Sequence, residues 1–338
     1  MQKHLWLVVK LGISVAILVW LFQLANAENQ FDELFASEKN WGFLTLALLA
    51  NVTAHIVSYY RWSIMARAIG FSLSTMEAIK IGLIGTFFNL IAFGVIGGDS
   101  FRAYYAARHS KDKIPEAISS VFADRFVGLM SIFGVAIVAF NLKDFSLLDS
   151  VEKEKLGAIQ NTFRVVTICF CLGIVALVLL FLSPKLREFK AIKWAESLQF
   201  VGPLVTRVLD VVGLYQKNPG TILTCVGYSV FTNALFVTSL YFCACGLIES
   251  YPTFANHFII VPVSLVASAV PLPGGLGLEV AITFLYQSFA DQSADVAPAG
   301  FIASLGFHVT ILFVSLMGCI VWVAYRKEAS SIASEAEK

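Results

Sequence analysis

Five charged side chains lie inside or beside long apolar runs of this sequence. Arg102 and Arg125 carry guanidinium groups, whose planar donors suit the oxygens of a phosphate. Asp99, Asp124 and Glu279 are acids that could change charge during a cycle. An ionisable group at membrane depth is costly, so each of the five is a functional candidate. We expect the two arginines to receive an anionic headgroup and the three acids to be candidates for charge coupling.

A structural role competes with this functional one. Asp124 and Arg125 are adjacent, and about 100° separates neighbouring residues around a helix, so these two side chains need separate partners. They could pair with Asp99, Arg102 and Glu279 simply to hold the fold together. Both hypotheses remain open at the level of sequence.

Two glycine pairs accompany these charges, at 97–98 and 274–275. Four residues after the second glycine of each pair stands a charge, Arg102 in one case and Glu279 in the other. Glycines allow a turn at membrane depth, and a helix that starts there favours an anion at its N-terminus. The candidate headgroup residues are therefore Arg102, Arg125, Asn89, Gly97, Gly98, Gly274 and Gly275.

Other reactive residue types form no recognisable constellation. There is no phosphate-binding loop, no nucleophile elbow and no zinc-binding spacing. We expect His55, His257 and His308 to be hydrogen-bonded packing residues. The six cysteines all fall in apolar runs and suit packing better than disulfides or metal ligation. The expectation is no cofactor, no metal and no enzymatic activity.

The composition indicates a multi-pass membrane protein. Of 338 residues, 58% are apolar and only 14% are charged, with a mean hydropathy of +0.77. These values exclude an ordinary soluble enzyme and a disordered chain. The net charge of +1 gives no basic face for nucleic acid, so no nucleic-acid partner is expected.

The elements that must position these residues follow from the apolar runs. Each run long enough to cross a bilayer should be a helix, because backbone in lipid must satisfy its own hydrogen bonds. The predicted fold is all-α, with six transmembrane helices and two re-entrant helical hairpins in an inverted repeat. The crossings are 5–24, 41–60, 117–140, 162–182, 221–247 and 301–325; the hairpins are 81–110 and 254–290; the rest are an exterior loop 141–161, an amphipathic cytoplasmic segment 186–216 and a cytoplasmic tail 326–338.

The distribution of Lys and Arg sets the orientation. The connection 61–80, which includes Arg61, and the residues after the first hairpin are both basic, so that hairpin enters and leaves on the cytoplasmic side. Neither flank of the second hairpin carries Lys or Arg, so it enters from the exterior. The halves 1–140 and 162–325 then have the same order of elements and opposite orientation, as in many transporters. Both termini are expected in the cytoplasm, with residues 1–27 retained as an anchor rather than cleaved as a signal peptide.

Three motifs resemble the lysylphosphatidylglycerol synthase transmembrane-region family, also called flippase-like. They are residues 89–104 (NLIAFGVIGGDSFRAY), 120–128 (SVFADRFVG) and 271–279 (PLPGGLGLE), and Arg61-Trp62 also fits. The resemblance covers nearly the whole chain. It departs at Phe93, where the family often has Pro, and at Leu278, where many members have Arg, so no second basic group stands beside Glu279.

The resemblance implies a module that moves lipids or lipid-linked intermediates between leaflets of the cytoplasmic membrane. Only 13 residues follow Tyr325, so we expect no aminoacyl-transferase domain. The expected partners are membrane lipids with an anionic or lipid-linked headgroup, and a lipid- or glycan-modifying enzyme. The alternatives are an ion- or proton-coupled carrier of a small anionic solute, a membrane-embedded headgroup transferase, and a non-catalytic subunit of a glycolipid pathway. The sequence does not indicate an oligomeric state.

Overall fold

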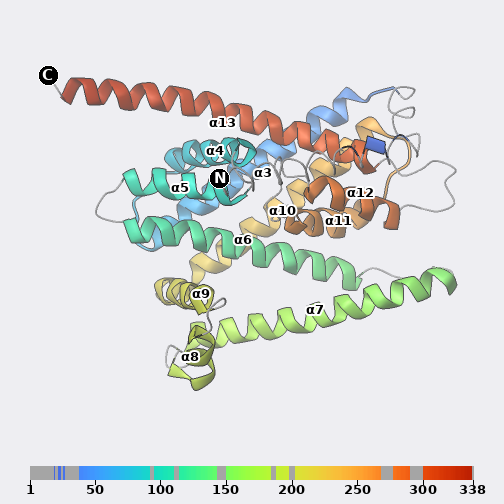
Figure 1. The fold of residues 1–338 in the computed structure, drawn as a ribbon, viewed down its shortest axis with the longest axis horizontal. Coiled ribbons are helices and arrows are strands. Elements are labelled where there is room, and N and C mark those ends of the chain that lie inside the picture. The colour runs from blue at the N-terminus through green and yellow to red at the C-terminus, as the bar shows by residue number, and fades with distance from the viewer. Residues whose placement is uncertain are drawn as a thin grey trace, which may run out of the picture.

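The structure is a computed structural model that describes residues 38–91, 95–109, 114–142, 150–183, 188–197, 202–267, 277–289 and 300–336, with isolated residues between 19 and 26. Within these ranges the chain forms eleven helices and no strand (Figure 1). The helices are α3 (Trp41–Ala68), α4 (Thr75–Ile91), α5 (Val95–His109), α6 (Ile114–Leu142), α7 (Ser150–Leu182), α8 (Lys190–Ser197), α9 (Gly202–Tyr215), α10 (Pro219–Leu247), α11 (Phe254–Ala267), α12 (Gly277–Phe289) and α13 (Gly300–Ala336).

Four of the helices are long and apolar enough to cross a membrane: α3, α6, α10 and the part of α13 up to Ala324. Two shorter apolar helical stretches, Phe170–Leu182 in α7 and α11, accompany them. The all-helical, multi-pass membrane architecture is therefore confirmed. The predicted crossing 5–24 lies largely outside the described residues.

Several helices extend beyond the apolar runs that predicted them. Residues 150–161 form the first turns of α7, so the prediction of a loop through 161 is wrong there. Likewise α13 continues to Ala336, into the predicted tail, and α4 begins at Thr75 rather than 81. Hydropathy marks the part of a helix that contacts lipid, whereas polar helix formers such as Glu and Lys let the helix continue beyond it.

Local sequence fixes the connection between α3 and α4. After α3, Gly70 adopts φ +79°, and the amides of Gly70 and Phe71 donate to the carbonyls of Arg67 and Ala66 at 3.0 and 3.1 Å. This is the hydrogen-bond pattern by which a left-handed glycine ends a helix. The next helix starts with a reciprocal cap. The Ser74 amide donates to the Glu77 carboxylate at 2.8 Å and the Glu77 amide to the Ser74 hydroxyl at 3.2 Å.

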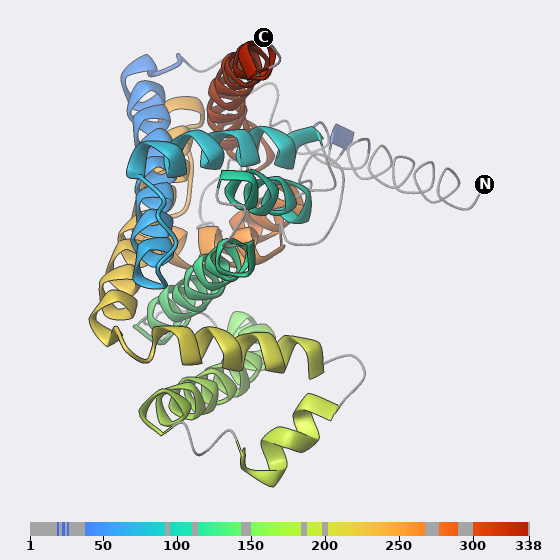
Figure 2. The same cartoon turned by 90° about the vertical axis from the view of Figure 1, so that its left-hand side faces the viewer.

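Two long antiparallel helices, α3 and α10, pack side by side along one edge of the molecule (Figure 2). Helices α3 and α10 make the most extensive helix–helix contact in the described chain. The Asn40 amide donates to the Gly246 carbonyl at one end of the pair, and the Asn218 side chain donates to the Ala68 carbonyl at the other. The α4–α5 pair and the α11–α12 pair pack beside these two helices, toward opposite ends of the long axis (Figure 1).

Each of these two helix pairs returns to the end at which it began. In the first pair, Ala78 near the start of α4 and Ala106 near the end of α5 share a buried cluster. In the second pair, Asn256 at the start of α11 donates to the carbonyl of Phe289 at the end of α12, at 3.4 Å. Helix α4 packs on α13, and α11 packs on α6.

Helices α7, α8 and α9 form a layer on one side of the others (Figure 2). Pro203 stands in the first turn of α9, as its fixed φ favours. The Tyr215 hydroxyl at the end of α9 donates to the Met65 carbonyl at 2.9 Å and anchors this layer to α3. One face of α7 is exposed and apolar, as expected of a helix that contacts lipid; its exposed side chains include Val165, Ile168, Leu172, Val175 and Leu182.

Candidate functional site

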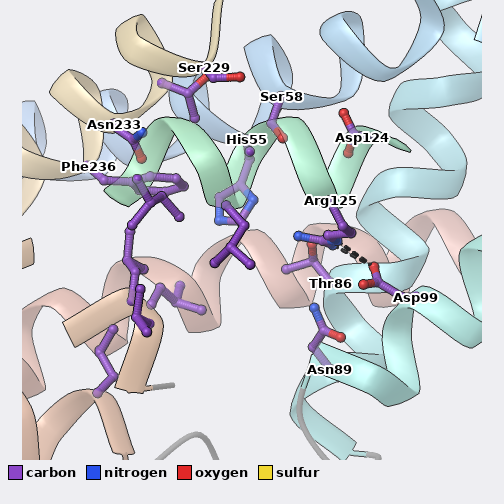
Figure 3. Close-up of a pocket in the computed structure, with 18 of the residues that line it drawn as sticks. His55, Ser58, Thr86, Asn89, Asp99, Asp124, Arg125, Ser229, Asn233 and Phe236 are labelled. Atoms are coloured by element: carbon purple, nitrogen blue, oxygen red, sulfur yellow. Dashed lines mark hydrogen bonds and ion pairs between the residues drawn. The ribbon is translucent and has the colours of Figure 1, made fainter. Parts of the chain in front are cut away.

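A cavity of about 440 Å³ lies where the two helix pairs approach α3 and α10. Its wall is contributed by helices α3 to α6 and α10 to α13, so both halves of the chain surround it. Figure 3 shows charged residues on one part of this wall and Phe236 with Asn233 on another. The uncharged polar residues on the wall include Ser58, Thr86, Asn89, Ser229, Thr232 and Ser315.

Asp124 of α6 lies fully buried between two arginines. Its Oδ1 accepts from Arg61 Nε of α3 at 2.9 Å and also lies 2.9 Å from Nη2, while its Oδ2 accepts from Arg102 Nη2 of α5 at 3.3 Å. Arg61 also donates to the Ser229 hydroxyl of α10 at 2.5 Å. The carboxylate therefore ties α3, α5 and α6 together, and Arg61 extends the link to α10.

Arg102 is held from a second direction by an aromatic ring. Its guanidinium carbon lies 4.4 Å from the centre of the Trp62 ring, a cation–π contact, and the Trp62 indole donates to the Ser120 hydroxyl at 3.1 Å. Only 2% of Arg102 is exposed, so it cannot contact a ligand in this conformation. Arg102 was predicted as a headgroup residue, but the structure places it behind the cavity wall, where it supports Asp124.

Arg125 is the arginine that faces the cavity. Its Nε donates to Asp99 Oδ1 at 2.8 Å and its Nη2 lies 2.6 Å from the same oxygen, yet 43% of its side chain remains exposed (Figure 3). Asp99 also lies 3.6 Å from Arg102 Nη1 and so joins the two arginines. The first half thus places three guanidinium groups and two carboxylates together, with one positive charge in excess.

Glu279 and His308 form a separate hydrogen-bonded pair in the second half. The Nδ1 atom of His308, on α13, lies 2.5 Å from Oε1 of Glu279, on α12. Glu279 is 2% exposed, whereas His308 lines the cavity. The other carboxylate oxygen of Glu279, Oε2, is buried and has no hydrogen-bond partner among the residues that the structure describes. The Glu279 carboxylate is therefore linked to the cavity by its contact with the His308 imidazole, which lines the cavity.

Gly98, from the first glycine pair, and Asn89 form a close contact between α5 and α4. The Gly98 amide donates to Asn89 Oδ1 at 3.0 Å. A Cβ atom on Gly98 would overlap Asn89 Oδ1 and the Gly85 carbonyl oxygen, so only glycine fits this approach. Gly97 lies in the first turn of α5. The predicted site residues Gly274 and Gly275 lie outside the described residues.

The part of the chain that the structure describes contains no candidate metal centre. Among the described residues, no group of three or more His, Cys, Asp or Glu side chains could hold a metal ion. The donors on the cavity wall are guanidinium, amide, hydroxyl and imidazole groups, which suit an anion that also carries hydroxyl groups.

The sequence did not identify Arg61 and His308 as parts of the site. Arg61 was assigned to a basic connection outside the membrane, but it lies within α3 and is 4% exposed. His308 was expected to be a packing residue, but it faces the cavity and pairs with Glu279. Charge balance was the available signal, since each acid in an apolar run requires a cationic or protonatable partner.

The comparisons with known proteins agree with the resemblance in the three motifs. A search of the curated proteins gave no match. A comparison with protein families matches residues 7–318 to the transmembrane region of lysylphosphatidylglycerol synthase. Because this match covers most of the chain, the protein belongs to the lysylphosphatidylglycerol synthase TM region family.

Proposed function

We propose that this protein translocates an anionic, phosphate-bearing lipid headgroup between the leaflets of the cytoplasmic membrane. One observation carries the proposal: the half-exposed guanidinium of Arg125 stands on the wall of a cavity that both halves of the chain enclose. A volume of about 440 Å³ is within the range of about 300–1,000 Å³ usual for small-molecule sites. The headgroup would occupy the cavity while the acyl chains stay in lipid.

The fold proposed for this activity has six crossings and two oppositely oriented re-entrant hairpins, α4–α5 and α11–α12. The packing supports an inverted repeat in which α3 corresponds to α10, α4 to α11, α5 to α12 and α6 to α13. Each contact among these eight helices then has a counterpart; for example, α4 packs on α13 as α11 packs on α6. Transporters built from such repeats place the substrate near the midplane.

The remaining assignments follow the sequence. Both termini lie in the cytoplasm, because the basic connections are on that side. The protein acts as a transporter. An enzyme that makes or modifies the lipid is its expected partner.

Replacement of Arg125 tests the proposal directly. Full-length protein is reconstituted in phosphatidylcholine vesicles that contain phosphatidylglycerol, and periodate added outside oxidises only exposed glycerol headgroups. Wild-type protein should bring inner-leaflet headgroups to the outside. Arg125→Ala should slow this transfer about ten- to hundredfold, the effect of losing one charge-assisted contact.

The matched control is Arg164→Ala, which removes an exposed arginine on α7 outside the cavity and should leave transfer unchanged. Equal transfer by wild type and Arg125→Ala would contradict the role of Arg125. Uptake of soluble glycerophosphate into the vesicles without any lipid transfer would favour the small-solute carrier instead.

A further inference from the structure

We propose that Glu279 and His308 form a proton-binding site in the cavity wall, and that the protein binds one proton together with its anionic ligand. This inference rests on the proposed function for the ligand, an anionic headgroup. It adds a second, chemically different species to the same site.

Two of the three candidate acids are held in the charged form by guanidinium groups. Asp124 contacts both Arg61 and Arg102, and Asp99 contacts both Arg125 and Arg102. An arginine remains protonated at any physiological pH and strongly favours a carboxylate beside it. Asp99 and Asp124 therefore each have permanent counter-ions and do not depend on a partner that can change its charge.

Glu279 differs because its ion-pair partner can itself change charge. Within the described part of the chain, its only ion pair is with His308, and its Oε2 has no hydrogen-bond partner. A buried carboxylate without a permanent counter-ion is unfavourable, so one proton on either member of the pair relieves that cost. Histidine is the side chain best suited to gain and lose a proton near neutral pH.

The other titratable groups around α12 do not supply a fixed charge to this pair. On α11, His257 is engaged by the Tyr286 hydroxyl at 2.7 Å and by the Thr253 carbonyl at 2.9 Å. Tyr286, on α12 itself, is fully buried, and Cys243 of α10 lies in the same apolar cluster. The charged and titratable groups that face the pair across the cavity are His55, Arg61, Asp99, Asp124 and Arg125.

The charges on the cavity wall then depend on this proton. With Glu279 ionised and His308 neutral, the pair carries one negative charge, which offsets the single positive excess of the Arg61, Arg102, Arg125, Asp99 and Asp124 group. With one proton added, at the second ring nitrogen of His308 or on the Glu279 carboxylate, the pair is neutral and the wall is positive. An anion therefore binds better to the protonated protein, and by linkage its binding raises the affinity for the proton.

The two halves place these charges in corresponding positions. Arg102 and Glu279 each stand four residues after a glycine pair, and each pairs with the helix that follows its hairpin, α6 in one case and α13 in the other. The first half provides a permanent cation at this position and the second half a titratable acid. The exposed cation Arg125 also belongs to the first half, so anion binding and proton binding fall to different halves.

Calorimetry on the full-length protein in detergent tests the inference without requiring transport. The probe is glycerophosphoglycerol, a soluble phosphodiester, titrated from pH 6 to pH 9 in pairs of buffers with different ionisation enthalpies. The difference between buffers gives the protons taken up per ligand. Uptake should approach about one proton at the alkaline end, where affinity should fall about tenfold per pH unit.

The double variant Glu279→Gln/His308→Gln should still bind the probe, with no proton uptake from this pair and a flat pH profile. The matched control, Glu116→Gln, changes a carboxylate that also has a buried oxygen without a partner among the described residues but lies outside the cavity, and it should behave as wild type. If the double variant does not fold, Glu279→Gln alone must shift the midpoint of the pH profile to lower pH, because it removes the carboxylate that stabilises the imidazolium.

Three results would overturn the inference: binding by wild type without proton uptake at any pH, unchanged uptake in the double variant, or no binding of the probe at pH 6. Proton-linked binding together with a failure to move lipid in vesicles would instead contradict only the proposed translocation. The two proposals therefore fail in distinguishable ways.

Discussion

At the scale of single residues, Asp124 is the group on which the buried charges of the first half depend. It is fully buried, and its carboxylate contacts the guanidinium groups of both Arg61 and Arg102. These two arginines are themselves only 4% and 2% exposed. Gly128, one turn further along α6, leaves room for Arg61, since a Cβ there would lie 3.2 Å from its Nη2. Two buried cations without this carboxylate would repel each other in a medium of low polarity.

Asp124→Asn should therefore destabilise the protein by about 3–5 kcal/mol, the usual effect of removing one partner of a buried ion pair. A lower melting temperature of the detergent-solubilised protein is the measurement. Asp210→Asn, on the exposed face of α9, makes the same chemical change and should alter the melting temperature little. Equal stability of the two variants would show that Asp124 is not needed to balance the arginines.

The charged residues of the first half were accessible from sequence, but their pairing was not. Asp99, Asp124, Arg102 and Arg125 were identified because charges in apolar runs are rare. Which arginine contacts which acid depends on helices far apart in the chain; Arg61 and Asp124 are 63 residues apart. Arg61 also follows an apolar run directly, where a basic residue normally marks the membrane surface, and so its burial was not predicted.

At the scale of elements, the α4–α5 pair depends on close backbone contact at Gly98. Gly98→Ala should prevent this approach, because the added methyl group would overlap the Gly85 carbonyl and the Asn89 side chain. The expected loss is about 1–3 kcal/mol or failure to fold. Gly227→Ala in α10 is the control: nothing lies within 4 Å of its added Cβ, so it should be neutral or stabilise by up to about 1 kcal/mol. Thermal unfolding that ranks the two variants in the opposite order would contradict the packing described for this pair.

The attachment of α9 can be tested through Tyr215. Burial raises the pKa of the Tyr215 hydroxyl, so the folded protein keeps its proton at a pH where the unfolded chain loses it. The stability from this group is complete below the ordinary tyrosine pKa of about 10 and declines as the pH rises above it. Tyr215→Phe removes the hydrogen bond to Met65 and should cost about 1 kcal/mol at pH 8. The melting temperatures of the two proteins should converge above pH 10, and a constant difference would contradict this account.

The helical elements themselves were largely predictable, because an apolar run of this length has few alternatives to a helix in lipid. Their ends were less so. Polar residues extend the N-terminal end of α7 to Ser150 and the C-terminal end of α13 to Ala336, because the hydrogen-bond pattern of a helix does not stop at the edge of its apolar part. The amphipathic segment 186–216 was predicted as one unit, and its described residues contain two helices, α8 and α9.

At the scale of the whole molecule, the proposed inverted repeat relates α3 to α10, and its axis would lie between these two helices. In the first half, Arg102 of α5 contacts Asp124 of α6. In the second half, Glu279 of α12 contacts His308 of α13, so the two residue pairs join corresponding helices. A site between such halves is enclosed by opposed helix pairs. Rocking of one half against the other would change which end of the cavity is open.

Cysteine labelling tests this symmetry, in a background from which the six native cysteines have been removed. Ser74 before α4 and Ile114 at the start of α6 flank the first helix pair, while Thr253 before α11 and Ser288 near the end of α12 flank the second; all four are exposed. If both pairs are re-entrant and opposed, Ser74→Cys and Ile114→Cys should react with an impermeant maleimide from the same side of sealed vesicles. Thr253→Cys and Ser288→Cys should react only from the other side. Labelling of Ser74→Cys and Ile114→Cys from different sides would make α4–α5 a full crossing, and the two halves could then no longer be related by inversion.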